Sequence, residues 1–155
     1  MGIFYCDIKD NTSVTWSDLI ADIKSTENYN KYCYNSNYYD IFKHIALSLI
    51  LGEEIILIDY NLSSAEILNL TGYNCFQQFI KPIDLSKLSS IDSKDNLVSL
   101  FIEPPKTWSI TLFTSGTTGI PKEVTHTYAS IARFVKINPA KRFDIWGFAY
   151  NPTHI

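Results

Sequence analysis

The sequence lacks an excess of basic residues. Its 13 Lys and Arg residues are outnumbered by 16 Asp and Glu residues, so the formal net charge is −3. Nucleic acids and anionic membrane surfaces are bound through clusters of positive charge. Aromatic platforms that stack on bases also carry interleaved Lys or Arg, and Lys31 is the one such residue among the tyrosines between positions 29 and 39. We therefore expect neither nucleic acid nor membrane as a partner.

Cysteines and long hydrophobic runs are also scarce. Cys6, Cys33 and Cys75 are odd in number, widely spaced and outside any CxxC motif, which argues against a zinc site and favours free thiols. The longest apolar stretch covers residues 45–52, well short of the ~20 residues that a membrane helix needs. The first residues also lack the basic region of a signal peptide. These absences predict a cytoplasmic protein whose site contains no metal-ligand cluster.

Hydrophobic residues make up 46% of the 155 residues and charged residues 19%, which is typical of one folded domain. Residues 38–51 have helical apolar spacing, Gly52 follows, and residues 54–59 form a nearly continuous apolar run. A helix, a glycine and a strand buried on both faces form the repeating unit of a parallel α/β sheet. We predict a single α/β domain over residues 1–155, with a layered, mainly parallel sheet and flanking helices.

Apolar spacing and turn residues predict the remaining elements. We expect further strands over residues 3–8, 31–34, 97–102, 108–113 and 145–150. The strand over 108–113 should have one buried face. Ser17 can cap a helix that contains Leu19, Ile20 and Ile23, and Ser63 or Ser64 can cap another that ends before Gly72. Residues 83–96 are predicted to form a surface connection with about one helical turn.

The most informative segment follows the strand predicted over residues 108–113. It combines four hydroxyl side chains, two glycines, a proline and a lysine, in the order Thr114, Ser115, Gly116, Thr117, Thr118, Gly119, Ile120, Pro121, Lys122. Glycines let the backbone approach a ligand closely, and N–H and hydroxyl groups donate to phosphate oxygens. We expect the next helix, which runs to about residue 137, to point its positive end at the ligand. The segment is neither a Walker A loop nor a GxGxxG motif, yet its composition predicts a phosphate-binding loop.

The order Ser-Gly-Thr-Thr-Gly-x-Pro-Lys in this segment resembles the signature of the adenylate-forming superfamily of AMP-forming ligases. That superfamily contains acyl-CoA synthetases, peptide-synthetase adenylation domains and firefly luciferases. Residues 15–19, 51–59 and 151–155 are similar to other segments of these enzymes and occur in the same order. The resemblance implies an enzyme that uses ATP to activate a small carboxylic acid as acyl-AMP. A thiol of coenzyme A or of a carrier protein would then accept the acyl group.

The resemblance also implies roles for individual residues. The loop from Thr114 to Lys122 would hold the β- and γ-phosphates of ATP as pyrophosphate leaves. Ser115, Thr117 and Thr118 would donate hydrogen bonds, and the lysine would neutralise developing charge. A bridging Mg²⁺ is implied as well, although no ligand for it is identifiable in the sequence.

Three histidines are candidates for roles in or near the site. His154 matches the histidine beside the acyl pocket in many members of the family, and a surface or turn role for it remains open. His126 aligns with a histidine often present in the family, and we expect it at the start of the helix after the loop, in a structural role. His44 lies within the helix predicted over residues 38–51, and we expect it to be structural too.

Two departures from the family pattern affect the prediction. Glu123 stands where a glycine is usual, which brings a negative charge near the phosphates; we expect it to face solvent on the first helical turn. The sequence also ends at Ile155, before the segments that the family uses for adenine, ribose and the adenylation lysine. We therefore expect an N-terminal fragment of a longer ligase that is inactive alone and prone to dimerise through uncovered surfaces. A non-catalytic nucleotide- or phosphate-binding module, or one subunit of a split enzyme, remains the alternative.

Overall fold

The computed structural model describes residues 2–114, 121–133 and 151–153. Its elements, in chain order, are β1 (Ile3–Asp7), β2 (Thr12–Thr15), α1 (Trp16–Lys24), β3 (Asn28–Asn30), β4 (Tyr32–Tyr34), α2 (Tyr38–Leu51), β5 (Ile55–Ile58), α3 (Ser64–Thr71), the 3₁₀ turn η1 (Gln77–Phe79), β6 (Ile80–Pro82), α4 (Leu85–Ser89), α5 (Lys94–Ile102), β7 (Ser109–Thr114), β8 (Lys122–Thr127) and α6 (Tyr128–Ala132). The strand predicted over residues 145–150 lies outside the described residues.

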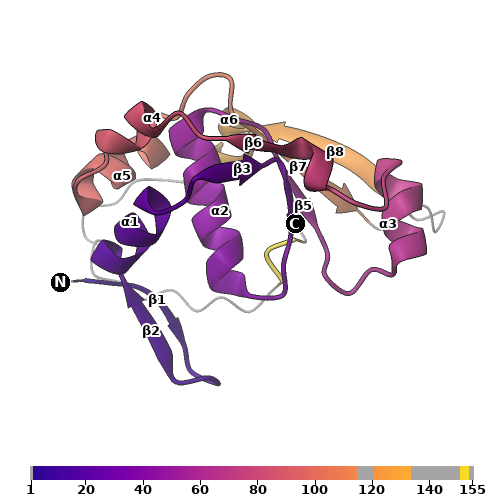
Figure 1. Ribbon diagram of the computed structural model, residues 1–155, viewed down its shortest axis with the longest axis horizontal. Coiled ribbons are helices and arrows are strands. Elements are labelled where there is room, and N and C mark those ends of the chain that lie inside the picture. The colour runs from indigo at the N-terminus through magenta and orange to yellow at the C-terminus, as the bar shows by residue number, and fades with distance from the viewer. Residues whose placement is uncertain (1, 115–120, 134–150, 154–155) are drawn as a thin grey trace.

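The largest sheet has the strand order β4-β5-β7-β8 (Figure 1). β5 is parallel to both β4 and β7, whereas β7 and β8 are antiparallel. Two antiparallel ribbons, β1–β2 and β3–β6, accompany this sheet. The predicted α/β class is therefore confirmed, but the predicted mainly parallel sheet is not: among the described strands, parallel pairing is limited to β4 with β5 and β5 with β7, and the other three pairings are antiparallel.

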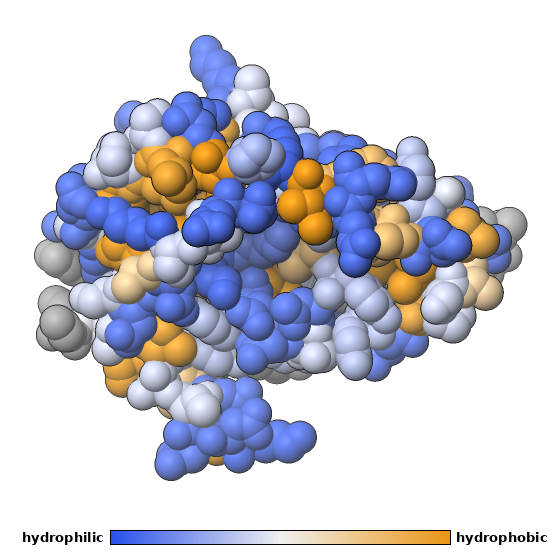
Figure 2. Space-filling model, viewed as in Figure 1, coloured by the Kyte–Doolittle hydropathy of each residue, from blue (hydrophilic) through white to orange (hydrophobic). Residues whose placement is uncertain are grey.

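The sheet is covered on both faces, because β5 is buried at all four of its positions. On one face, α2 packs through Ile41 and Leu49 against Leu57 and Leu112. On the other face, Ile56 and Ile58 of β5 form a smaller cluster with Ile67 of α3. Partly buried side chains pack against this cluster, namely Tyr32, Leu62, Phe76 and Phe113. A third cluster joins α1, α2, α4 and α5 beside the sheet. On the face shown in Figure 2, hydrophobic side chains form separate small groups among hydrophilic ones.

Local capping explains why several predicted elements are confirmed. Asn37 caps the start of α2, where its side chain accepts from the Tyr39 and Asp40 N–H groups, and Gly52 caps its end with φ 69°. Ser63 and Glu66 form a capping box at the start of α3. α1 also has a capping box, but its cap is Thr15 rather than the predicted Ser17. Such caps satisfy the N–H groups that a helix start leaves without intrahelical partners.

The strand predicted over residues 97–102 is wrong, because these residues belong to helix α5. Ser93 caps this helix by accepting from the Asn96 N–H group. Leu97, Leu100 and Phe101 follow helical spacing and pack on the cluster that α1 and α2 form. The contact of this stripe with two other helices decides the conformation, since a short apolar run is compatible with either element.

The helix lengths bear on one expectation from the sequence. Among the helices within residues 2–114, 121–133 and 151–153, none is both long enough and apolar enough to cross a membrane.

Candidate phosphate-binding site

The predicted phosphate-binding segment connects β7 to β8. These strands pair along their whole length, from Ser109 opposite Thr127 to Thr114 opposite Lys122. Thr114 and Lys122 therefore lie side by side at the base of the connection. The predicted binding residues between them, Ser115, Gly116, Thr117, Thr118 and Gly119, lie outside the described residues.

The segment begins at the carboxyl end of β7, which is parallel to β5. Ile55 pairs with Ile110 and Ile56 with Thr111, and because the two strands run in the same direction, Asp59, directly after β5, and Thr114, the last residue of β7, both lie at the carboxyl end of the sheet. Ligands of open α/β sheets bind outside the carboxyl ends of parallel strands. The start of the predicted loop is thus at the edge where this kind of sheet binds ligands.

A strand, not a helix, follows the segment, which corrects the prediction. β8 runs from Lys122 to Thr127, and α6 begins only at Tyr128. The start of α6 is therefore separated from the segment by the length of β8, and it cannot supply the positive helix end that we expected beside a phosphate. Positive charge at the base of the segment comes from the Lys122 side chain.

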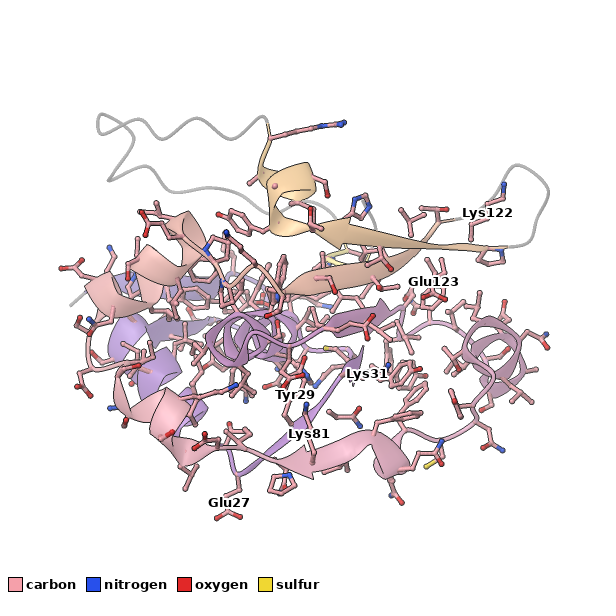
Figure 3. All side chains as sticks on the ribbon, turned by 90° about the horizontal axis from the view of Figure 1, so that it is seen from above. Glu27, Tyr29, Lys31, Lys81, Lys122 and Glu123 are labelled. Atoms are coloured by element: carbon pink, nitrogen blue, oxygen red, sulfur yellow. The ribbon has the colours of Figure 1, made fainter. Side chains whose placement is uncertain are left out.

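Lys122 and Glu123 project from opposite faces of β8, since successive side chains of a strand alternate. Figure 3 shows the two side chains on opposite sides of the hairpin. Glu123 pairs with Phe113 on the face that also holds Tyr32. Burial raises the pKa of Tyr32, and Glu123 is among the nearby charges that raise it further. The position predicted for Glu123, on a first helical turn, is wrong, and its carboxylate is directed away from the Lys122 ammonium.

The Thr114 hydroxyl already has a partner in the hairpin. Its Oγ1 donates to the backbone carbonyl of Lys122 over 3.4 Å. This is a long hydrogen bond, so its loss on ligand binding would cost little. Thr114 can either close the base of the hairpin or turn its hydroxyl hydrogen toward a phosphate oxygen.

The same edge of the sheet gathers a segment that is distant in sequence. The Asn151 Nδ2 group donates to Asp59 Oδ1 over 3.4 Å. Thr153 is buried, and its backbone N–H and its hydroxyl both donate to Asn151 Oδ1, at 3.0 and 2.8 Å. His154, the predicted acyl-site residue, follows directly but lies outside the described residues. The sequence analysis did not identify Asp59 as the residue that binds the segment containing Asn151. The position of this aspartate directly after a buried strand was a signal that could have found it.

The other two histidines lie apart from the base of the loop. His126 is on β8 opposite Ile110 and directly precedes Thr127, the cap of α6; its Nδ1 atom is 3.5 Å from Ser130 Oγ in the first turn, so it lies beside a helix start as predicted, although that helix does not directly follow the loop. The His44 Nε2 atom is 2.6 Å from the Asn30 carbonyl oxygen, and its ring lies against Tyr29. Burial lowers the pKa of His44. These contacts agree with the structural role predicted for it.

The described residues also give the titratable composition of the site. Within them, no three His, Cys, Asp or Glu side chains gather in a group that could hold a metal ion. Cys6, Cys33 and Cys75 are free, as predicted. At the base of the loop, Lys122 offers an ammonium and Thr114 a hydroxyl, whereas the Glu123 carboxylate projects from the opposite face of β8 and the Asp59 carboxylate accepts from Asn151. The ammonium and the hydroxyl fit an anion.

No protein-family model, curated protein or solved structure matches this chain. Its function must be inferred from its own residues.

Proposed function

We propose that this chain holds the phosphates of ATP in a ligase that activates a small carboxylic acid as its acyl adenylate. The loop from Thr114 to Lys122 is the phosphate-binding element in this proposal. The observation that supports it is the order of hydroxyl residues, glycines, proline and lysine, which begins at the carboxyl end of a strand with a parallel neighbour. Both the composition and the place suit phosphate oxygens.

The proposed chemistry is electrostatic. When a carboxylate oxygen attacks the α-phosphorus of ATP, negative charge builds up on the departing pyrophosphate. The Lys122 ammonium and the loop hydroxyls would stabilise that charge without forming a covalent bond. Mg²⁺ would share the same phosphates. The activated acyl group would then pass to a thiol, with coenzyme A or a carrier-protein pantetheine as acceptor.

Binding of ATP, pyrophosphate and AMP to the chain, measured by calorimetry with Mg²⁺ present, tests the loop assignment. Lys122→Ala should weaken ATP and pyrophosphate about tenfold or more, because a charge-assisted contact is lost. AMP lacks the β- and γ-phosphates, so its affinity should not change. Lys9→Ala is the matched control, since Lys9 is exposed in the turn after β1. Equal effects of the two lysine variants, or unchanged ATP affinity in Lys122→Ala with Gly116→Ala, would refute the assignment.

Carboxylate-dependent exchange of labelled pyrophosphate into ATP, measured on the natural protein with a panel of acids, tests the ligase step. Exchange that requires both a carboxylic acid and Lys122 supports a ligase. ATP binding without exchange for any acid would instead favour a phosphate-binding module. The two measurements therefore separate the loop assignment from the reaction.

A further inference from the structure

A second candidate binding site lies between α1 and α5, distant from the predicted loop. The cavity has a volume of about 380 Å³, within the range of small-molecule pockets. It is lined by one face of α1, the residue before β1 and the turn that starts α5, namely Gly2, Trp16, Ser17, Ile20, Ala21, Lys24, Asp92, Ser93 and Lys94. α1 and α5 lie at the left end of the molecule in Figure 1, whereas Lys122 lies toward the right end in Figure 3, which has the same horizontal axis.

The walls of this cavity are held by specific contacts. The Trp16 backbone N–H donates to the Gly2 carbonyl over 3.2 Å, which holds the start of the chain against α1. At the other end of α1, Lys24 forms an ion pair with Asp92, just before the Ser93 cap of α5. The hydrogen bond at one end of the cavity and the ion pair at the other therefore hold α1 against the two segments that face it.

The lining combines an apolar wall with an excess of positive charge. Trp16, Ile20 and Ala21 present apolar surface from α1. The charged groups are two ammoniums and one carboxylate, and Lys24 already pairs with the Asp92 carboxylate. The Lys94 Nζ atom lies 5.1 Å from the centre of the Trp16 ring. In the described part of the chain no salt bridge involves Lys94, so its ammonium lies over the Trp16 ring without forming an ion pair there.

We propose that this cavity binds a small aromatic carboxylate. Its ring would lie on the apolar wall of α1, and its carboxylate would pair with the Lys94 ammonium. The ligand would replace the Lys94–Trp16 contact with a charge-assisted hydrogen bond, which is the stronger of the two interactions. The site needs neither the loop nor ATP, so it is independent of the proposed ligase function.

Titration of the full chain with 2-naphthoate, followed by two-dimensional ¹H–¹⁵N NMR, tests the proposal. The indole signal of Trp16, identified with Trp16→Phe, and the amide signals of Ile20 and Ala21 should shift along one saturable curve. Lys94→Gln should weaken binding about tenfold, whereas Lys9→Gln, the matched exposed lysine, should not. The neutral amide of the same ring should bind more weakly than the acid.

A second variant guards against a trivial loss of folding. Ala21→Leu keeps a good helix former on α1 and fills the cavity, so it should abolish binding while circular dichroism stays unchanged. Lys122→Ala should leave 2-naphthoate binding intact, which separates this site from the loop. Unsaturable binding, shifts centred elsewhere, or equal affinity in Lys94→Gln would overturn the proposal.

Discussion

One buried hydrogen bond ties the residue directly before β7, the strand that leads into the predicted loop, to helix α2. The Trp108 Nε1–H group, directly before β7, donates to the Ser48 hydroxyl of α2 over 2.8 Å. Ser48 is 0% exposed and Trp108 is 4% exposed, so water cannot replace the partner. Ser48→Ala therefore leaves a buried indole N–H without an acceptor.

The cost of this change is the difference between two opposing effects. A buried donor left without a partner costs about 1–3 kcal/mol. Alanine is a better helix former than serine and returns about 0.5 kcal/mol. The net loss in the free energy of unfolding should be about 1–2 kcal/mol. Urea unfolding followed by circular dichroism measures it, and the midpoint should fall with an unchanged slope.

Ser99→Ala is the matched control. Ser99 lies exposed on α5, and its hydroxyl donates to the Asn96 carbonyl over 2.7 Å, as Ser48 donates to the Ile45 carbonyl over the same distance. The two serines thus differ in the Trp108 contact, in the contact of Ser48 with the buried Tyr29 side chain, and in burial. In a Trp108→Phe background, Ser48→Ala should cost less than in the natural sequence, because no indole N–H remains. An equal cost in both backgrounds, or a cost no larger than that of Ser99→Ala, would refute the reasoning.

Three further predictions concern the fold that supports the site. Gly52→Ala should lower the free energy of unfolding by about 1–2 kcal/mol, because Gly52 has φ 69° and a Cβ would lie 3.2 Å from Pro105 Cβ and Thr107 Oγ1; an unchanged urea midpoint would contradict this. Ser63→Ala should lower the free energy of unfolding by about 1 kcal/mol and Ser63→Gly by only a few tenths, because glycine is tolerated at a helix cap. Urea unfolding of the two variants measures this difference, and equal losses would contradict the capping role of Ser63. Burial lowers the pKa of His44, so the unfolded chain binds the proton first as pH falls. The stability that neutral His44 contributes is complete above the unfolded pKa of about 6.5 and is lost as pH falls toward the lower folded value. The difference in stability between the natural chain and His44→Gln should therefore shrink on acidification below that pH, and a difference that grows instead would exclude this linkage.

Sequence patterns predicted the elements whose causes are local. The helix over residues 38–51 and the strand over 54–59 were read from apolar spacing and from Gly52, and both are present. The cap at Ser63 likewise depends on residues within one turn. Such signals act over a few positions, so they can be read without knowing which other parts of the chain lie nearby.

Errors arose where distant contacts choose between two locally acceptable conformations. Residues 97–102 read as a strand but are helical, because Leu97 and Phe101 pack against other helices. Residues 122–127 were predicted to hold the start of the helix after the loop, although they pair with β7 as a strand. Thr125 and Thr127 are β-branched and alternate with Val124 and His126, a strand signal that the resemblance to a loop–helix motif obscured. The burial of β7 on both faces was likewise missed, because it depends on the side-chain clusters that cover the two faces of the sheet, one of which includes α2 and the other α3.

The sequence by itself determined the cap at Ser63, the helix end at Gly52, the buried central strand and the order of residues that predicts phosphate binding. These follow from side-chain chemistry within a few positions. Only the tertiary structure decided that the predicted loop connects two antiparallel strands, that Glu123 points away from Lys122, and that Asn151 reaches Asp59. It also brought Trp16 and Lys94 together at one cavity. These placements depend on strand pairing and helix packing between segments far apart in the chain, which no local pattern encodes.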